Sequence, residues 1–264
     1  MKECGETDDS QRTGSTSAPV IPVIDLMRGV VVRGVAGKRE EYRPIKSLLC
    51  DEPLPGAVGG AFARLGFREA YVADLDAIAG AEPDWPTYEV LMGCGLKLLC
   101  DAGAGTGRRA RELAEFTHDR QRLAAVIVGL ESIADESDLA AAVEAATPGR
   151  TIFSLDLRAG VPTTRVPPWK DLTAQTIAER VIDLGVRRII VLDLARVGVN
   201  TGVSTTELCR RLRKLYPALE IISGGGVRNA DDLRALAEAG CDAALVASAL
   251  HDGRLTAADL PVVD

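Results

Sequence analysis

The chain has 264 residues, a formal net charge of −7 and a pI near 5.1, and 47% of its residues are hydrophobic. This length and composition suit one large α/β domain whose core needs no disulfide or metal. The acidic balance argues against broad binding to nucleic acid or to anionic membranes, although it permits a small anionic ligand held by local donors.

The N-terminal residues 1–19 differ from the rest of the chain. The stretch up to Ala18 is polar and rich in Ser, Thr, Gly and Asp, and it lacks the apolar segment of a signal peptide. We therefore expect a disordered tail. The six cysteines form no CxxC pair and the two histidines lie in no motif, so we expect reduced thiols, no metal site and a cytoplasmic location. No apolar run is long enough to span a membrane.

From residue 20 onward, short apolar runs alternate with helical segments. Strands are expected at Val20–Leu26, Glu69–Asp76, Lys97–Asp101, Leu123–Val128, Thr151–Leu157, Arg188–Leu194, Glu220–Gly224 and Ala243–Val246. Helices are expected at Ala57–Gly66, Asp84–Gly93, Arg108–Phe116, Asp138–Ala146, Thr173–Leu184, Thr205–Tyr216 and Asn229–Gly240. Val30–Val35 is also strand-like, and the charged stretch Gly37–Pro55 is expected to be a long loop.

The strands are continuously apolar and rich in β-branched residues, which is typical of strands buried on both faces. Eight strand–helix alternations in this length predict a single (β/α)8 TIM barrel over residues 20–264, with an open doubly wound sheet as the structural alternative. Strands one to four also echo strands five to eight, with corresponding features roughly 120–130 residues apart. We therefore expect two half-barrel repeats.

Three glycines, Gly224, Gly225 and Gly226, follow the seventh strand and precede a helix. Backbone N–H groups of bare glycines at such a turn can approach an anion closely. Ala247 and Ser248 end the next strand beside the same space. We expect these five residues to bind phosphate, the alternative being that the glycines merely form a tight turn.

Gly103 and Gly105 follow the third strand, across the mouth of the expected barrel. They predict a second and weaker phosphate site. The carboxylate of Asp101 lies nearby, and a carboxylate beside a phosphate is unfavourable. We therefore expect the second phosphate to be absent or bound in another way.

Aspartates end several of the expected strands. Asp25 and Asp156 end strands one and five, which face each other in a ring of eight. This placement predicts a catalytic acid–base pair, although a lone aspartate at a strand end can instead cap the next turn. For Asp74, Asp76 and Asp193, we expect capping or loop tethering.

Taken together, these motifs resemble the histidine-biosynthesis (β/α)8-barrel family, and within it the phosphoribosylformimino-aminoimidazole-carboxamide ribotide isomerases. The resemblance rests on Ile21–Leu26, Val32–Lys38, Val72–Asp76, Val126–Gly129, Ser154–Asp156, Ser223–Arg228 and Val246–Leu250. It implies an Amadori rearrangement of a ribosylamine, with Asp25 as base, Asp156 as acid and Arg33 in contact with substrate. It implies no cofactor. The expected partner is a small phosphorylated metabolite, and the expected state is a monomer or weak homodimer.

The chain departs from that family's pattern at two places. Leu192 stands where the isomerases have a catalytic threonine, and the Asp-Gly-Thr that follows in them is absent. The loop after strand three lacks their Gly-Gly-Gly-Ile-Arg. A cyclase of the same family shares both aspartates. The remaining alternatives are a diverged barrel enzyme acting on another phosphorylated sugar or aminosugar, and a non-catalytic phosphometabolite-binding protein.

Overall fold

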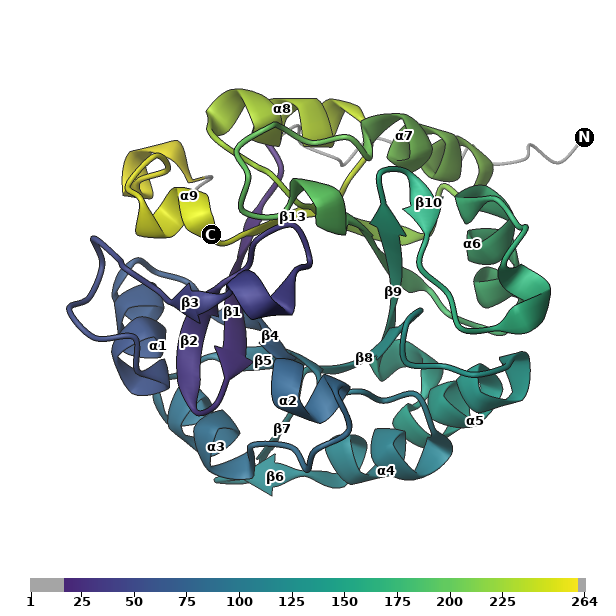
Figure 1. The fold of residues 1–264 in the computed structure, drawn as a ribbon, viewed down its shortest axis with the longest axis horizontal. Helices are drawn as coiled ribbons and strands as arrows, with labels where there is room; N and C mark the ends of the chain where they lie inside the picture. Colours follow the sequence, from purple (N-terminus) through teal and green to yellow (C-terminus); the bar gives the residue numbers. More distant parts are fainter. Residues whose placement is uncertain (1–16, 261–264) are drawn as a thin grey trace, which may run out of the picture.

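The structure is a computed structural model that describes residues 17–260. Within this range, eight parallel strands close into a ring that is surrounded by helices (Figure 1). In ring order the strands are β1 (Val20–Met27), β4 (Glu69–Asp74), β5 (Lys97–Asp101), β8 (Ala125–Gly129), β9 (Thr151–Arg158), β11 (Arg188–Asp193), β12 (Glu220–Gly224) and β13 (Ala243–Val246). The predicted (β/α)8 barrel is confirmed.

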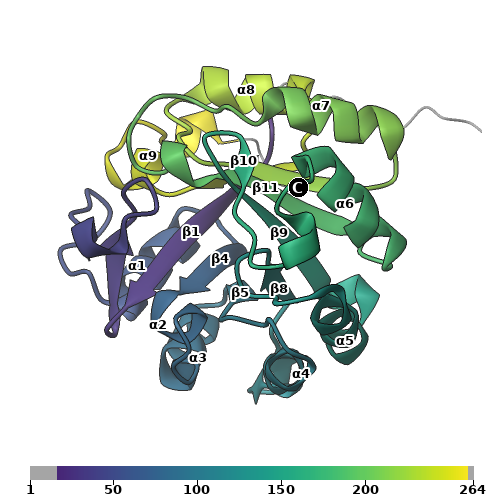
Figure 2. The same ribbon diagram turned by 45° about the vertical axis from the view of Figure 1, so that its right-hand side comes forward.

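Helices surround the barrel, and all but the last of them lie between consecutive barrel strands (Figures 1 and 2). They are α1 (Pro55–Arg64), α2 (Leu75–Ile78), α3 (Trp85–Gly93), α4 (Gly107–Glu115), α5 (Glu136–Ala146), α6 (Ala174–Asp183), α7 (Thr206–Leu215), α8 (Ala230–Glu238) and α9 (Ser248–His251). Shorter 3₁₀ turns are η1 (Arg39–Glu41), η2 (Pro148–Arg150), η3 (Pro167–Trp169), η4 (Leu194–Arg196) and η5 (Ala257–Asp259). No helix within residues 17–260 is long and apolar enough to cross a membrane.

The first and last strands close the ring. Val20, Ile21 and Pro22 of β1 pair in parallel with Ala244, Leu245 and Val246 of β13. The chain is already ordered just before β1, because Ala18 is buried and donates its N–H to the Leu233 carbonyl at 3.2 Å. Most of the tail expected at residues 1–19 lies outside the described residues, but Ala18 belongs to the folded barrel.

Two apolar clusters fill the molecule. One occupies the barrel interior and contains large side chains from successive strands, including Leu99, Ile127, Ile152, Ile190 and Ile222. The other lies between the strands and the helices. Strands that are buried on both faces explain why the sequence runs are continuously apolar.

Two strand-end aspartates hold short helical turns. Asp74 accepts the Ala77 N–H at 3.0 Å and the Tyr88 hydroxyl at 2.6 Å, and Asp193 accepts the Ala195 N–H at 3.1 Å. The structural role predicted for both aspartates is confirmed. β4 and β11 are the second strands of the two halves, four strands apart in the ring, so the equivalent positions of these aspartates agree with the half-barrel repeat.

A hairpin extends β1 beyond the ring and positions the first loop. β1 turns at Arg28 and Gly29, both with positive φ, and returns as the antiparallel strand β2 (Val30–Arg33). The strand predicted at Val30–Val35 is therefore confirmed. β2 pairs with β3 (Arg43–Pro44), within the predicted loop Gly37–Pro55. The remaining short strands are β6 (Thr117–His118), β7 (Gln121–Arg122) and β10 (Val161–Pro162).

Candidate active site

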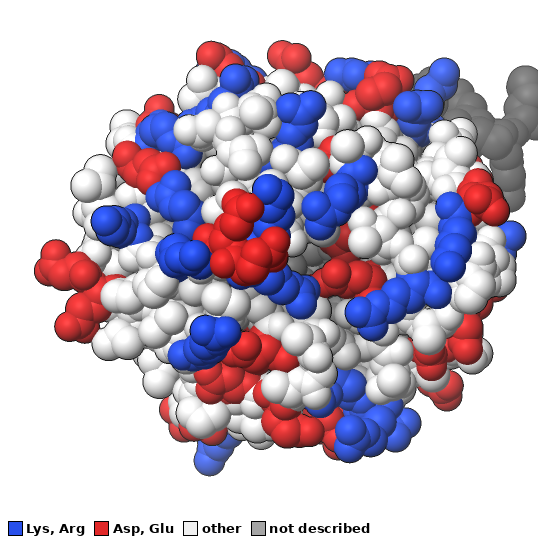
Figure 3. Space-filling model, in the orientation of Figure 1, with Lys and Arg blue, Asp and Glu red and all other residues white. Residues whose placement is uncertain are grey.

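A cavity opens at the carboxyl ends of the barrel strands. It encloses about 1330 Å³, including space open to solvent, and residues from most of the ring line it. Charged side chains of both signs surround the hollow on this face of the molecule (Figure 3). This is the end at which the working residues of such barrels lie.

The strand register sets the carboxylates around the cavity. Asp25 of β1 pairs with Ala73 of β4, which pairs with Asp101 of β5. On the opposite side, Asp156 of β9 pairs with Leu192 of β11. Asp25, Asp101, Asp156 and Leu192 all line the cavity, so the predicted pair of opposed aspartates meets across one space.

A glycine separates two of these carboxylates. A Cβ atom added at Gly129 of β8 would lie 3.6 Å from Asp101 Oδ2 and 3.6 Å from Asp156 Oδ2. Both aspartates are buried, and Asp156 Oδ1 accepts the Ser154 hydroxyl at 2.8 Å. Two buried carboxyl groups are therefore gathered on this side of the mouth.

Burial changes the acidity of all three aspartates. It raises the pKa of Asp25 to about 7, an effect that the positive charge of Arg39 partly opposes. Burial, with a smaller contribution from Glu131, also raises the pKa of Asp101 to about 7. The pKa of Asp156 is raised well above its ordinary value by burial and then by the charges of Glu131 and Asp101. Carboxyl groups of this kind can exchange protons near neutral pH.

Arg39 lines the same cavity as these three aspartates. It belongs to η1, and its Nη2 lies 2.8 Å from Glu131 Oε1 in the loop after β8. The pair therefore links the first loop of the barrel to the fourth. Tyr42 also lines the cavity, and burial followed by the charge of Asp25 raises its pKa to about 12.

The first loop and the loop after β11 meet over the mouth, and we call their contacting residues 34–37 and 197–198 the strap. The Ala36 N–H donates to the Val197 carbonyl at 2.8 Å. A Cβ atom at Gly198 would lie only 1.9 Å from the Gly34 oxygen, so only glycine fits there. A Cβ atom at Gly34 would lie 3.1 Å from Asp25 Oδ2, which places the strap directly beside Asp25.

At the β12–β13 side, most of the residues predicted to bind phosphate line the cavity. Gly225, Gly226, Ala247 and Ser248 are among its lining residues. Gly224 does not line the cavity. A Cβ atom there would lie 2.8 Å from the Leu245 Cβ, so the missing side chain allows β12 to pack closely against β13. Phosphate binding at these residues stays a prediction.

The other predicted phosphate residues, Gly103 and Gly105, do not line this cavity. A Cβ atom would lie 2.9 Å from the Ala77 oxygen at Gly103 and 1.9 Å from the Ser132 oxygen at Gly105. Neighbouring backbone therefore fills the space beside both glycines. The structure brings the two predicted cradles to opposite sides of the mouth, but only the β12–β13 cradle is open to the cavity.

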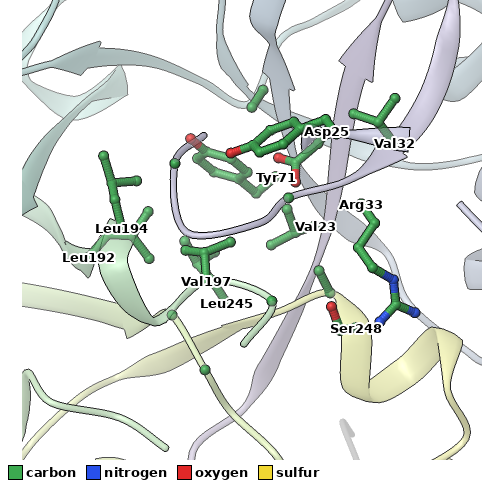
Figure 4. A pocket seen from close by; sticks show the side chains of 18 of the residues that line it. Val23, Asp25, Val32, Arg33, Tyr71, Leu192, Leu194, Val197, Leu245 and Ser248 are labelled. Atoms are coloured by element: carbon green, nitrogen blue, oxygen red, sulfur yellow. The ribbon is translucent and has the colours of Figure 1, made fainter. Parts of the chain in front are cut away.

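Arg33 points from β2 toward Ser248, on the side of the cavity away from Leu192 and Leu194 (Figure 4). Its guanidinium pairs with both carboxylate oxygens of Asp252, which also lies 3.1 Å from an Arg254 nitrogen. The predicted contact of Arg33 with substrate stays a prediction, and its position directs it to the Ser248 end of a ligand.

Sequence reasoning missed several residues of the site. Arg39, Tyr42 and Glu131 come from loops whose course is not set by strand periodicity. The sequence predicts a role for Asp101 only as a carboxylate that disfavours phosphate binding at the neighbouring glycines. One signal is present in the sequence, because Asp101 follows an apolar run just as Asp25 and Asp156 do. Within residues 17–260, no group of three or more His, Cys, Asp or Glu side chains is arranged to hold a metal ion.

Comparison with known proteins shows the family to which this chain belongs. Residues 19–256 match the family model described as "Histidine biosynthesis protein". The chain belongs to the histidine biosynthesis protein family. This match spans the whole barrel and includes every residue of the cavity.

Individual proteins are similar to this chain over nearly their full length. The 1-(5-phosphoribosyl)-5-((5-phosphoribosylamino)methylideneamino)imidazole-4-carboxamide isomerase of Halobacterium salinarum is 30% identical over 250 residues, covering 92% of this chain and 96% of the relative. The isomerase of the same name from Acinetobacter baylyi is 29% identical over 242 residues, covering 90% and 94%. An uncharacterized protein of Methanocaldococcus jannaschii is 27% identical over 237 residues, covering 89% and 94%.

Proposed function

We propose that this protein is an aldose–ketose isomerase that carries out an Amadori rearrangement on a phosphorylated ribosylamine-type substrate. The observation that carries the proposal is the pair Asp25 and Asp156. These carboxyl groups come from opposite strands, line one cavity and have raised pKa values caused chiefly by burial. The names of the relatives support isomerase activity in general.

The two aspartates would divide the proton transfers. Asp156, as the acid, would protonate the ring oxygen while the bond from that oxygen to C1 breaks, leaving a protonated imine between C1 and the amine nitrogen. Asp25, as the base, would then remove the proton from C2 to give a neutral enaminol. Asp25 would return its proton to C1 and Asp156 would accept the enol proton, which gives the ketone and restores both groups. The rearrangement is redox-neutral and consumes no second reactant.

The open cradle would fix one end of the substrate. Gly225, Gly226 and Ser248, the first residue of α9, line the cavity, and bare backbone donors suit phosphate oxygens. Arg33 is oriented toward Ser248 and would add positive charge there (Figure 4). Holding the phosphate would place the sugar between Asp25 and Asp156.

Steady-state kinetics on the ribonucleotide named in the isomerase relatives tests this proposal. We expect turnover within the ordinary range of about 1–10³ s⁻¹ if that ribonucleotide is the substrate. Absence of both turnover and binding with this compound, together with unchanged phosphate affinity in a Ser248→Asp variant, would contradict the proposed site.

A second candidate is the same chemistry on a different phosphorylated sugar or aminosugar. Leu192 favours it, because this apolar side chain is paired in register with Asp156 where a hydroxyl could have shared its proton. A site built around a hydroxyl loses on the order of 1–3 kcal/mol when that group is missing and its partner stays unpaired.

Leu192→Thr separates the two candidates. If the natural substrate is the relatives' ribonucleotide, the new hydroxyl should raise kcat/KM for it, by about tenfold for each 1.4 kcal/mol recovered. Leu192→Val, which removes bulk without adding a hydroxyl, is the matched control. No gain over the valine variant would favour the second candidate.

A further inference from the structure

The two sides of the cavity offer very different backbone donors. At the β12–β13 side, the N–H groups of Gly226 and Ser248 lie outside the strand ladders and donate to no acceptor within residues 17–260. Gly225 and Gly226 have positive φ values of 80° and 92°, a conformation suited to glycine. This side can therefore give several hydrogen bonds to one anionic group.

At the β5–β8 side, the equivalent donors are already used. The Gly103 N–H donates to Asp101 Oδ1 at 3.3 Å, and the Gly105 N–H donates to the Gly103 carbonyl at 2.8 Å. The Ser132 carbonyl covers Gly105, and the Ser132 N–H donates to the Gly129 carbonyl at 2.9 Å. The N–H groups of Gly103, Gly105 and Ser132 are therefore not available to a second phosphate.

The side chains of the β5–β8 side are also acidic. Asp101 and Asp156 flank Gly129, and Glu131 follows in the next loop. The facing cation, Arg39, is paired with Glu131 at 2.8 Å, and Arg158 donates to the Ala36 carbonyl at 3.3 Å. A phosphate placed among these carboxylates would be repelled, whereas hydroxyl or ammonium groups would find hydrogen-bond acceptors.

We propose that the substrates of this cavity carry a single phosphate, held at the β12–β13 side, and a hydroxyl- or amine-bearing end without phosphate at the β5–β8 side. This inference rests on the proposed phosphate site and narrows its substrate class. It selects monophosphorylated sugars and aminosugars and disfavours substrates with a phosphate at each end, including the ribonucleotide named in the isomerase relatives, which carries two phosphoribosyl groups. It therefore favours the second candidate function over the first.

Calorimetric titration of the full chain with D-ribose 5-phosphate and D-ribulose 1,5-bisphosphate tests the inference. At pH 8.5, where Asp101 is ionised, we expect the monophosphate to bind at least about tenfold more tightly than the bisphosphate. Asp101→Asn keeps an acceptor for the Gly103 N–H but removes the charge. This variant should bring the two affinities closer, by several-fold, through tighter binding of the bisphosphate alone.

A second variant keeps failure of this inference distinct from failure of the proposed function. Ser248→Asp puts a carboxylate at the cradle and should weaken both sugars at least tenfold. If Ser248→Asp weakens both sugars while the wild type binds the bisphosphate as tightly as the monophosphate or more tightly, the single-phosphate inference is overturned and the phosphate site stands. If neither sugar binds, or Ser248→Asp leaves both affinities unchanged, the proposed phosphate site is wrong and the inference falls with it.

Discussion

Three aspartates line one cavity at the mouth of the barrel, and burial raises the pKa of each. Asp25 and Asp156 lie on opposite strands, and Asp101 stands beside Asp156 across Gly129. Burial of these groups opposes ionisation, which costs stability but brings their proton affinity into the range useful for catalysis. Asp74 and Asp193 also end strands, yet their oxygens are occupied by loop donors.

The first prediction concerns the acid–base pair. Asp25→Asn and Asp156→Asn should each lower kcat by about 10²–10⁴-fold, because an amide cannot exchange the required proton. Circular dichroism should show an unchanged fold. Asp76→Asn is the matched control, since Asp76 also follows a strand but accepts the Arg28 N–H outside the cavity. Full activity in either test variant would mean that the residue is structural.

The second prediction concerns the pH dependence of stability. Burial raises the pKa of Asp25 from 3.8 to about 7, so the native state keeps this proton where the unfolded chain has lost it. The stability associated with this group is fully present below pH 4 and is lost as the pH rises through 7. Asp25→Asn should therefore raise the free energy of unfolding at pH 8, by on the order of 1–4 kcal/mol, and change it little at pH 4.

Urea unfolding at both pH values measures this difference. The variant Asp171→Asn, on an exposed loop, should match the wild type at both. A stabilisation by Asp25→Asn that is equal at pH 4 and pH 8 would show that charge burial is not its cause.

At the scale of elements, the strap joins parts of the chain that are distant in sequence. Residues 34–37 follow the β1–β2 hairpin and touch residues 197–198 after η4. The contact is between backbones, because Gly198 leaves no side chain between the two loops. The strap thereby covers Asp25 and shapes the cavity from above.

The third prediction tests this close contact. Gly198→Ala places a Cβ atom 1.9 Å from the Gly34 oxygen, so the loops must separate. Gly29→Ala is the matched control: φ is 74° there and 71° at Gly198, but nothing lies within 4 Å of the new atom. We expect Gly198→Ala to cost about 1–3 kcal/mol more than the control in urea unfolding and to raise KM. Equal losses in the two variants would show that φ strain alone is responsible.

Strands and helices could be predicted from sequence because each carries its own periodic signal. The eight apolar runs predict the eight strands of the barrel. Because strands one and five lie opposite each other in a ring of eight, they also predict that Asp25 and Asp156 face each other. The strap, η1 and the Arg39–Glu131 pair could not be predicted, since they depend on long-range contacts between irregular loops. Gly103 and Gly105 show the same limit: a glycine-rich loop looks like a cradle until neighbouring backbone is placed beside it.

For the whole molecule, closure depends on the short pairing between β1 and β13. Three residue pairs join the ends of the ring, and β1 also pairs with β4 on its other edge. Losing the start of β1 would open the ring and expose the interior cluster to water. The stability of the barrel therefore depends on a few residues near the N-terminus.

The fourth prediction follows from this closure. A chain beginning at Ser17 should melt within about 2 °C of the full chain, because Ala18 and β1 are intact. A chain beginning at Val23 lacks Val20, Ile21 and Pro22, and it should lose cooperative unfolding in calorimetry. Cooperative melting of the shorter chain near the wild-type temperature would contradict the closure argument.

The backbone contact between Gly34 and Gly198 also bears on how long a bound molecule stays. The Ala36–Val197 hydrogen bond joins the two loops beside Asp25, and a hydrogen bond from Arg158 of β9 to the Ala36 carbonyl anchors the first of them. For a molecule bound beneath the strap, we expect the escape rate to depend on how often the two loops separate. Residence time could then be changed through two glycine-bearing segments, without altering any of the buried carboxyl groups.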